Sequence, residues 1–191
     1  SISSHDIPRF LNKSGDMLIT DVNYNDFVPS SENIERFKLA TTFQLTYSGA
    51  PMIYYGDEVG QVGGKDPDNR RTFPWDFNKD KWRVDLRDYY KKLIELRKAH
   101  KALIYGSFLT ILADDETGVY AYERFLDNDR VFVILNKSKK AVNIDLSIFD
   151  FDNNKFLFDY FSQKQYPVLD GKLKINLKGL NSIILVKGSD D

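Results

Sequence analysis

The chain has 191 residues, of which 42% are hydrophobic and 29% charged, enough for one large or two small domains. Its formal net charge of −1 gives no indication of a nucleic acid or an anionic membrane as partner, and no apolar run approaches the length that spans a bilayer. The absence of cysteine excludes disulfides and thiolate chemistry but leaves the compartment, cytoplasmic or secreted, unknown.

The first hundred residues are predicted to contain two helices. Residues 11–30 are rich in Asn, Asp and Gly and predict an irregular connection. Residues 31–47 and 82–100 place apolar side chains at helical spacing, and Ser30 or Ser31 can cap the first of these helices.

A strand and a charged loop are predicted between the two helices. The apolar run within residues 49–55 contains Ile53 and Tyr54 and favours a buried strand. The loop at residues 56–80 is rich in glycine, charge and aromatic side chains, and α/β barrels build their active sites in loops that follow buried strands. The order helix, strand, long loop, helix therefore predicts the end of an α/β barrel.

After Leu103 the pattern changes to short apolar or alternating runs separated by turn residues. Such regular spacing is typical of an antiparallel β-sandwich. We therefore predict one domain at residues 1–102 and a second at 103–191. The predicted strands cover residues 107–112, 118–124, 130–136, 141–146, 155–160, 172–177 and 182–187.

Two segments resemble the α-amylase superfamily of glycoside hydrolases. Residues 49–76, GAPMIYYGDEVGQVGGKDPDNRRTFPWD, resemble the last barrel strand and its loop, and the GG-x-DPD-x-RR spacing resembles the neopullulanase, cyclomaltodextrinase and maltogenic amylase branch. Residues 4–10, SHDIPRF, resemble the segment after the seventh barrel strand, with Ile7 in place of the usual threonine. The resemblance implies an α/β plus β fold: the last strand–helix units of a TIM (β/α)8 barrel, then an antiparallel β-sandwich C-terminal domain.

The resemblance also implies four site residues and no cofactor. Asp6 corresponds to the family's third carboxylate, which binds the 2- and 3-hydroxyls of the sugar whose bond is cut and stabilises the transition state. His5 is expected to donate to a hydroxyl of the same sugar, and Asp66 and Arg70 to contact the next sugar. From the residues alone, His5-Asp6 is also compatible with a surface turn before a proline, and Asp66 and Arg70 with an internal pair that stiffens the loop.

The implied activity is retaining hydrolysis of α-1,4 or α-1,6 bonds in an α-glucan oligosaccharide or polysaccharide. In this superfamily the nucleophile and the acid/base follow the fourth and fifth barrel strands, positions that we expect to precede Ser1. We therefore expect this chain to be inactive alone and to require the missing N-terminal part of the barrel or another copy. A transglycosylase or isomerase would share these motifs. The alternative from another class is a non-catalytic carbohydrate-binding or structural β-domain with a barrel remnant; no metal cluster is predicted.

Overall fold

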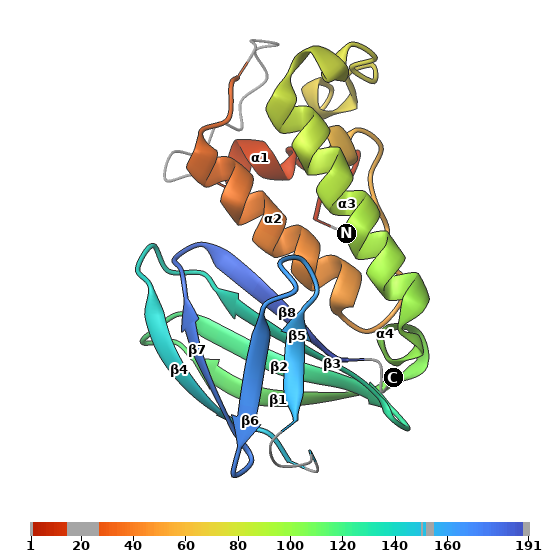
Figure 1. Ribbon diagram of the computed structural model, residues 1–191. Helices are drawn as coiled ribbons and strands as arrows, with labels where there is room; N and C mark the ends of the chain where they lie inside the picture. The colour runs from red at the N-terminus through yellow and green to blue at the C-terminus, as the bar shows by residue number, and fades with distance from the viewer. Residues whose placement is uncertain (1, 15–26, 150, 152–154, 189–191) are drawn as a thin grey trace. The chain divides into compact units, whose positions relative to one another are not determined.

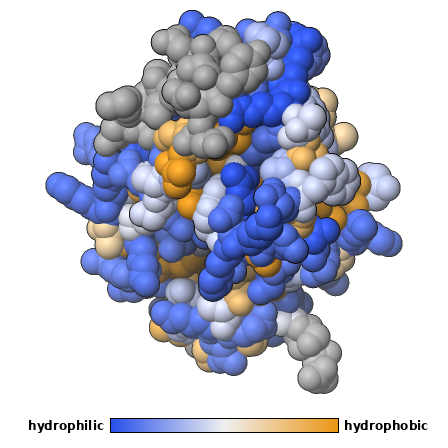
Figure 2. Space-filling view, turned by 90° about the horizontal axis from the view of Figure 1, so that it is seen from above, coloured by the Kyte–Doolittle hydropathy of each residue, from blue (hydrophilic) through white to orange (hydrophobic). Residues whose placement is uncertain are grey.

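A computed structural model describes residues 2–14, 27–149, 151 and 155–188 (Figure 1). The chain divides into two compact units, Ser1–Glu95 and Leu96–Asp191. Hydrophilic side chains predominate on the face seen in Figure 2, with apolar ones scattered between them. Within the described ranges, no helix combines the length and apolar character needed to cross a bilayer.

The first unit is helical, and its helices confirm the two that the sequence predicted. The longer pair are α2 (Ser31–Thr46) and α3 (Lys81–Ala99), and a short helix, α1 (Phe10–Lys13), precedes them. Ser30 caps α2: its hydroxyl accepts from the backbone N–H of Asn33, whose side chain accepts in return from the Ser30 N–H. Most of the predicted irregular connection, from residue 15 to 26, lies outside the described residues.

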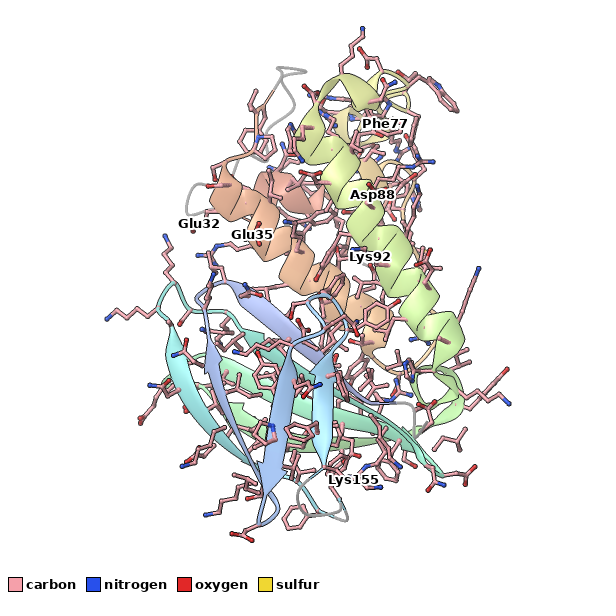
Figure 3. All side chains as sticks on the ribbon, in the orientation of Figure 1. Glu32, Glu35, Phe77, Asp88, Lys92 and Lys155 are labelled. Carbon is pink, nitrogen blue, oxygen red and sulfur yellow. The ribbon has the colours of Figure 1, made fainter. Side chains whose placement is uncertain are left out.

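Helices α2 and α3 bury apolar faces and expose charged ones. Leu86 and Leu93 of α3 are fully buried, and Tyr90 lies 6.1 Å from Phe37 of α2 between ring centroids. The Thr41 hydroxyl of α2 donates to the Tyr90 hydroxyl at 3.1 Å, so the buried hydroxyl of Tyr90 has a hydrogen-bond partner. The labelled side chains in Figure 3 include Glu32 and Glu35 on α2 and Asp88 and Lys92 on α3.

The prediction of a strand at residues 49–55 is wrong. The segment forms no strand in the structure, and Met52 and Tyr55 are 54% and 41% exposed. A strand is stabilised by hydrogen bonds to a neighbour, and among residues 2–14 and 27–95 the single β-pairing is an isolated bridge between Ser4 and Ile7. In the residues that the structure describes, the first unit is therefore helical and not α/β. Its assignment to a catalytic barrel stays a prediction.

The second unit begins with the last residues of α3, followed by α4 (Lys101–Tyr105), a short helix that was not predicted from the sequence. Eight antiparallel strands follow within its described residues. Seven of them overlap the predicted runs. The strands are β1 (Ser107–Asp114), β2 (Val119–Leu126), β3 (Asp129–Asn136), β4 (Val142–Ser147), β5 (Phe156–Asp159), β6 (Gln165–Leu169), β7 (Lys172–Leu177) and β8 (Asn181–Lys187).

The eight strands form one continuous sheet in the order β1-β2-β3-β8-β5-β6-β7-β4. The predicted β-sandwich is therefore correct in its antiparallel strands but wrong in expecting two separate sheets. Strand β5 pairs with both β8 and β6, and β6 pairs with β7, so hydrogen bonding continues around the curved sheet. The edge strands β1 and β4 contact each other, so the sheet is nearly closed into a barrel. A groove of about 340 Å³ lies between these two strands.

The core of the second unit explains the alternating pattern of β4 and β7. In β7 the buried residues Leu173, Ile175 and Leu177 alternate with exposed ones, and β4 repeats this with Ile144 and Leu146. Strand β3 is buried from residue 131 to 136, and helix α4 contacts both β3 and its neighbour β2, so the face of β3 away from the core is covered as well. The apolar side chains of the inner face make one hydrophobic cluster.

Candidate active site

His5 and Asp6 lie on a tight turn between Ser4 and Ile7, the two residues of the isolated β-bridge. The Asp6 backbone N–H donates to the Ser4 hydroxyl at 3.2 Å. His5 Nε2 and an Asp6 carboxylate oxygen are 3.1 Å apart, and the two side chains are 65% and 68% exposed. The turn therefore presents a paired imidazole and carboxylate to solvent, where a ligand can reach both.

Asp66 and Arg70 form a second exposed pair. Arg70 Nε and Asp66 Oδ1 are 2.8 Å apart, and each side chain is about half exposed. The loop between them is stiffened from inside by Asp68, which is 1% exposed and binds Arg71 and the Gly64 amide. Burial acts to raise the pKa of the Asp68 carboxyl, but the hydrogen bonds from Arg71 and Gly64 outweigh it and hold this pKa below its usual range.

The two pairs lie side by side although about sixty residues separate them in the chain. Arg70 Nε donates to the His5 carbonyl at 3.2 Å. The Asn69 amide donates to the carbonyls of Ser4, His5 and Ile7 at 3.3, 2.9 and 3.0 Å. All four predicted site residues are therefore brought together, and Asn69, which the sequence analysis did not single out, joins the two segments.

Arg9 lies beneath the site and connects three segments. Its side chain is fully buried, Nε donates to the Asn69 carbonyl at 3.0 Å, and one terminal nitrogen donates to the Tyr55 carbonyl at 2.6 Å. The same nitrogen is 3.1 Å from a carboxylate oxygen of Asp57, and the guanidinium lies 4.0 Å from the centre of the Tyr54 ring. Arg9 was also missed, because its partners come from a loop about fifty residues away.

Asp57 is a buried acid behind this site. Burial raises the pKa of its carboxyl to about 6, against the attraction of the Arg9 guanidinium. The Ser3 side chain also hydrogen-bonds this carboxyl and, like Arg9, acts to lower its pKa, but burial outweighs both. At 2% exposed, Asp57 faces the interior and does not join the exposed carboxylates.

We expect the substitution Asp57→Asn to flatten the pH dependence of the free energy of unfolding between about pH 4 and pH 6. The folded carboxyl binds its proton more tightly than the unfolded one, so its stabilising contribution is complete below about pH 4 and is lost as the pH rises through about 6. Urea unfolding at several pH values measures this slope. The control Asp88→Asn retains Asp57 and should retain the slope; equal slopes in both variants would contradict the assignment.

The polar groups of the two pairs can bind a hydroxylated ligand. Of their two exposed carboxylates, that of Asp6 is the one that is not paired with an arginine. The Asp66 carboxylate is engaged with Arg70. Retaining glycoside hydrolysis needs a second carboxyl group on the opposite side of the scissile bond. No cluster of potential metal ligands occurs among the residues that the structure describes.

Comparison with known proteins finds a family model that matches part of the chain and relatives that match nearly all of it. Residues 109–184 match the family model described as Maltogenic Amylase, C-terminal domain. The chain is 36% identical to an amylopullulanase of Thermoanaerobacter thermohydrosulfuricus, over 97% of this chain and 13% of that protein. It is 33% identical to neopullulanase 2 of Thermoactinomyces vulgaris, over 98% of this chain and 29% of that protein.

The solved structure of an Anoxybacillus α-amylase matches with a TM-score of 0.79 and 27% identity, over 100% of this chain and 38% of that one. The chain thus spans 13% and 29% of the two curated relatives described above and 38% of this structure.

Proposed function

Because residues 109–184 belong to the maltogenic amylase C-terminal domain family, we propose that this chain is the C-terminal part of a retaining α-glucan glycoside hydrolase. Its curated relatives include an amylopullulanase and a neopullulanase, and the proposed substrate is an α-glucan with α-1,4 or α-1,6 bonds. Since the chain spans a minor part of these relatives, the activity belongs to a longer assembly to which this chain contributes one side of the sugar site.

The observation that carries the proposal is the convergence of the two exposed pairs. Arg70 bonds the His5 carbonyl, and Asn69 bonds three carbonyls of the turn, so the pairs form one polar surface. A carboxylate accepts hydrogen bonds from hydroxyls and a guanidinium donates them, which suits a sugar with several hydroxyls. A structural pair alone would not require a second pair to be held beside it.

In the proposed mechanism, Asp6 accepts hydrogen bonds from the 2- and 3-hydroxyls of the sugar whose bond is cut. The contact to the 2-hydroxyl strengthens as the oxocarbenium-like transition state forms. His5 donates to a hydroxyl of the same sugar and orients Asp6, and Asp66 with Arg70 holds the next sugar. The nucleophile and the acid/base come from another part of the barrel, so this chain alone is inactive.

The second candidate is a non-catalytic carbohydrate-binding or structural β-domain. It is favoured by the family match, which lies entirely within the second unit. The two candidates differ in whether the first unit contributes to turnover.

We expect no release of reducing ends from maltohexaose by this chain alone, and release when it is mixed with a separately produced N-terminal part of the barrel. The physical reason is that the two required carboxyl groups would come from that part. A reducing-sugar assay measures both samples. Robust turnover by the purified chain alone would contradict the proposed division of the site, and inactivity of a mixture that binds maltohexaose would favour the β-domain alternative.

A further inference from the structure

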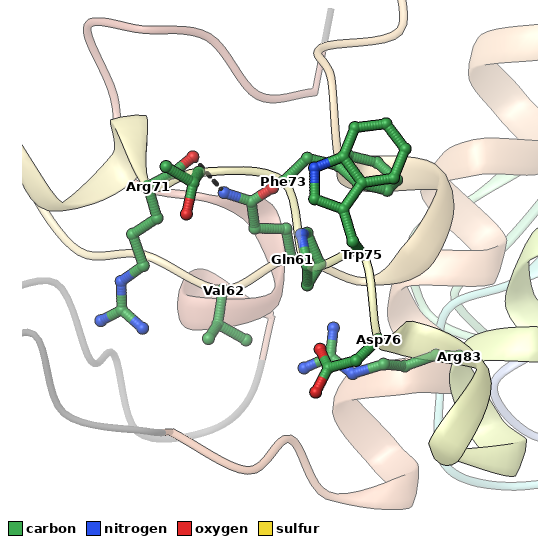
Figure 4. Close-up of a pocket in the computed structure, with 9 residues that line it drawn as sticks. Gln61, Val62, Arg71, Phe73, Trp75, Asp76 and Arg83 are labelled. Carbon is green, nitrogen blue, oxygen red and sulfur yellow. Dashed lines mark hydrogen bonds between the residues drawn. The ribbon is translucent and has the colours of Figure 1, made fainter.

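A pocket of about 440 Å³ lies beyond the site residues, in the first unit (Figure 4). It is lined by residues 71–76, which directly follow Arg70, together with Gln61, Val62 and Arg83. This volume is in the range of small-molecule sites. Gln61 donates to the Arg71 carbonyl at 2.8 Å, a bond drawn in Figure 4 that fixes one wall.

The pocket presents an indole to solvent. Trp75 is 83% exposed, an arrangement that contributes little to a core. Its ring lies 4.8 Å from that of Phe73 between centroids, and Phe73 is in turn 6.2 Å from Phe77. These rings brace the indole, which leaves a flat apolar face for a ligand.

The charges of the pocket are already paired within the protein. Arg71 binds Asp68 at 2.6 Å, and Arg83 binds Asp80 at 3.1 Å and donates to the carbonyls of Val59 and Gly60. Asp76 lies 3.4 Å from Lys79. An anionic ligand would have to compete with these carboxylates, so the pocket favours a neutral ligand that has hydroxyls and an apolar face.

We propose that this pocket is an additional subsite that binds a glucose unit of an α-glucan, with the sugar stacked on Trp75. A pyranose ring has an apolar face that suits the indole and peripheral hydroxyls that suit the polar wall. The pocket adjoins the Asp66–Arg70 pair along the chain, because its first lining residue of the loop, Arg71, follows Arg70, and the Tyr55 hydroxyl donates to the Arg71 carbonyl at 2.8 Å. This extension rests on the proposed function, since it assumes that a glucan occupies the Asp66–Arg70 pair.

The test is a calorimetric titration of the 191-residue chain with maltohexaose and with maltose. In Trp75→Ala we expect the Kd for maltohexaose to rise about tenfold, the loss typical of a truncated aromatic anchor, while the Kd for maltose changes little. Trp75→Phe retains a ring and should recover part of the affinity. Tyr105→Ala is the matched control, since Tyr105 is an aromatic residue, 76% exposed, in the other unit.

The outcomes separate this inference from the proposed function. If Trp75→Ala binds maltohexaose as tightly as the unsubstituted chain while Arg70→Ala loses binding, the additional subsite is overturned and the proposed function is supported. If Trp75→Ala loses binding while Arg70→Ala does not, the pocket is a glucan site and the role of Arg70 is overturned. Absence of maltohexaose binding to the unsubstituted chain, or an equal loss in Tyr105→Ala, would also overturn the subsite.

Discussion

Replacing Asp6 by asparagine is expected to lower kcat by roughly ten- to a hundredfold in the active mixture of this chain with the N-terminal part of the barrel. A hydrogen bond to a charged group contributes about 1.5–3 kcal/mol, and each 1.36 kcal/mol corresponds to about a factor of ten in rate. Asparagine keeps the shape of the side chain but removes the negative charge on which the proposed transition-state contact depends. Steady-state hydrolysis of maltohexaose measures the effect.

This expectation is specific to catalysis, because Asp6 contributes little to folding. Its side chain is 68% exposed, and that of its neighbour His5, 3.1 Å away, is 65% exposed. The melting temperature should therefore stay unchanged. Asp88→Asn is the matched control: it removes an exposed carboxylate of α3 that pairs with Lys91 at 3.4 Å, and kcat should be unaffected. Equal kcat values for Asp6→Asn and Asp88→Asn would exclude a role for Asp6 in the transition state.

Replacing Arg9 by methionine is expected to destabilise the chain by about 3–5 kcal/mol, the cost of leaving one partner of a buried ion pair without the other. Methionine fills part of the volume but removes the cation beside Asp57 and the donors to the carbonyls of Tyr55 and Asn69. Since Asn69 holds the turn at His5, sugar binding should weaken together with stability. Urea unfolding of the full chain measures the first effect and calorimetric titration with maltohexaose the second.

Arg36→Met is the matched control for this experiment. Arg36 makes a surface pair with Glu32 at 2.9 Å, both side chains are 30% exposed, and such helix pairs contribute only about 0.3–0.5 kcal/mol. The double variant Arg9→Met with Asp57→Asn should recover part of the loss, because it removes the uncompensated buried charge. Similar destabilisation by Arg9→Met and Arg36→Met would show that the buried pair does not hold these segments together.

The helices and most strands could be predicted because their signals are local. Helix α2 shows apolar residues at helical spacing after a serine cap, and β7 alternates between buried and exposed positions. Strand β6 was missed; it contains Pro167, which lacks an N–H donor and is atypical of a strand interior. In the structure Pro167 is the register partner of Phe156 in the preceding strand, β5.

The strand predicted at residues 49–55 does not form, because its local signal has no partner strand in the described residues. The composition of this segment suits a strand, but composition does not supply a neighbour, and β structure forms only where another backbone offers its hydrogen bonds. The strands of the predicted β-sandwich were identified from local patterns, but their arrangement in one curved sheet was not, for a related reason. Whether strands form one curved sheet or two depends on which strands pair, and that depends on pairings such as β5 with β8.

From the residue order alone, the motifs around His5-Asp6 and Asp66–Arg70 indicated the family, and the family match within the second unit and the relatives confirm that resemblance. Only the folded chain decides that these motifs meet. Their contact depends on Asn69 and Arg70 donating to backbone carbonyls more than sixty residues away. Every residue has such a carbonyl, so hydrogen bonds of this kind leave no trace in a sequence and appear only when packing brings the donor to its acceptor.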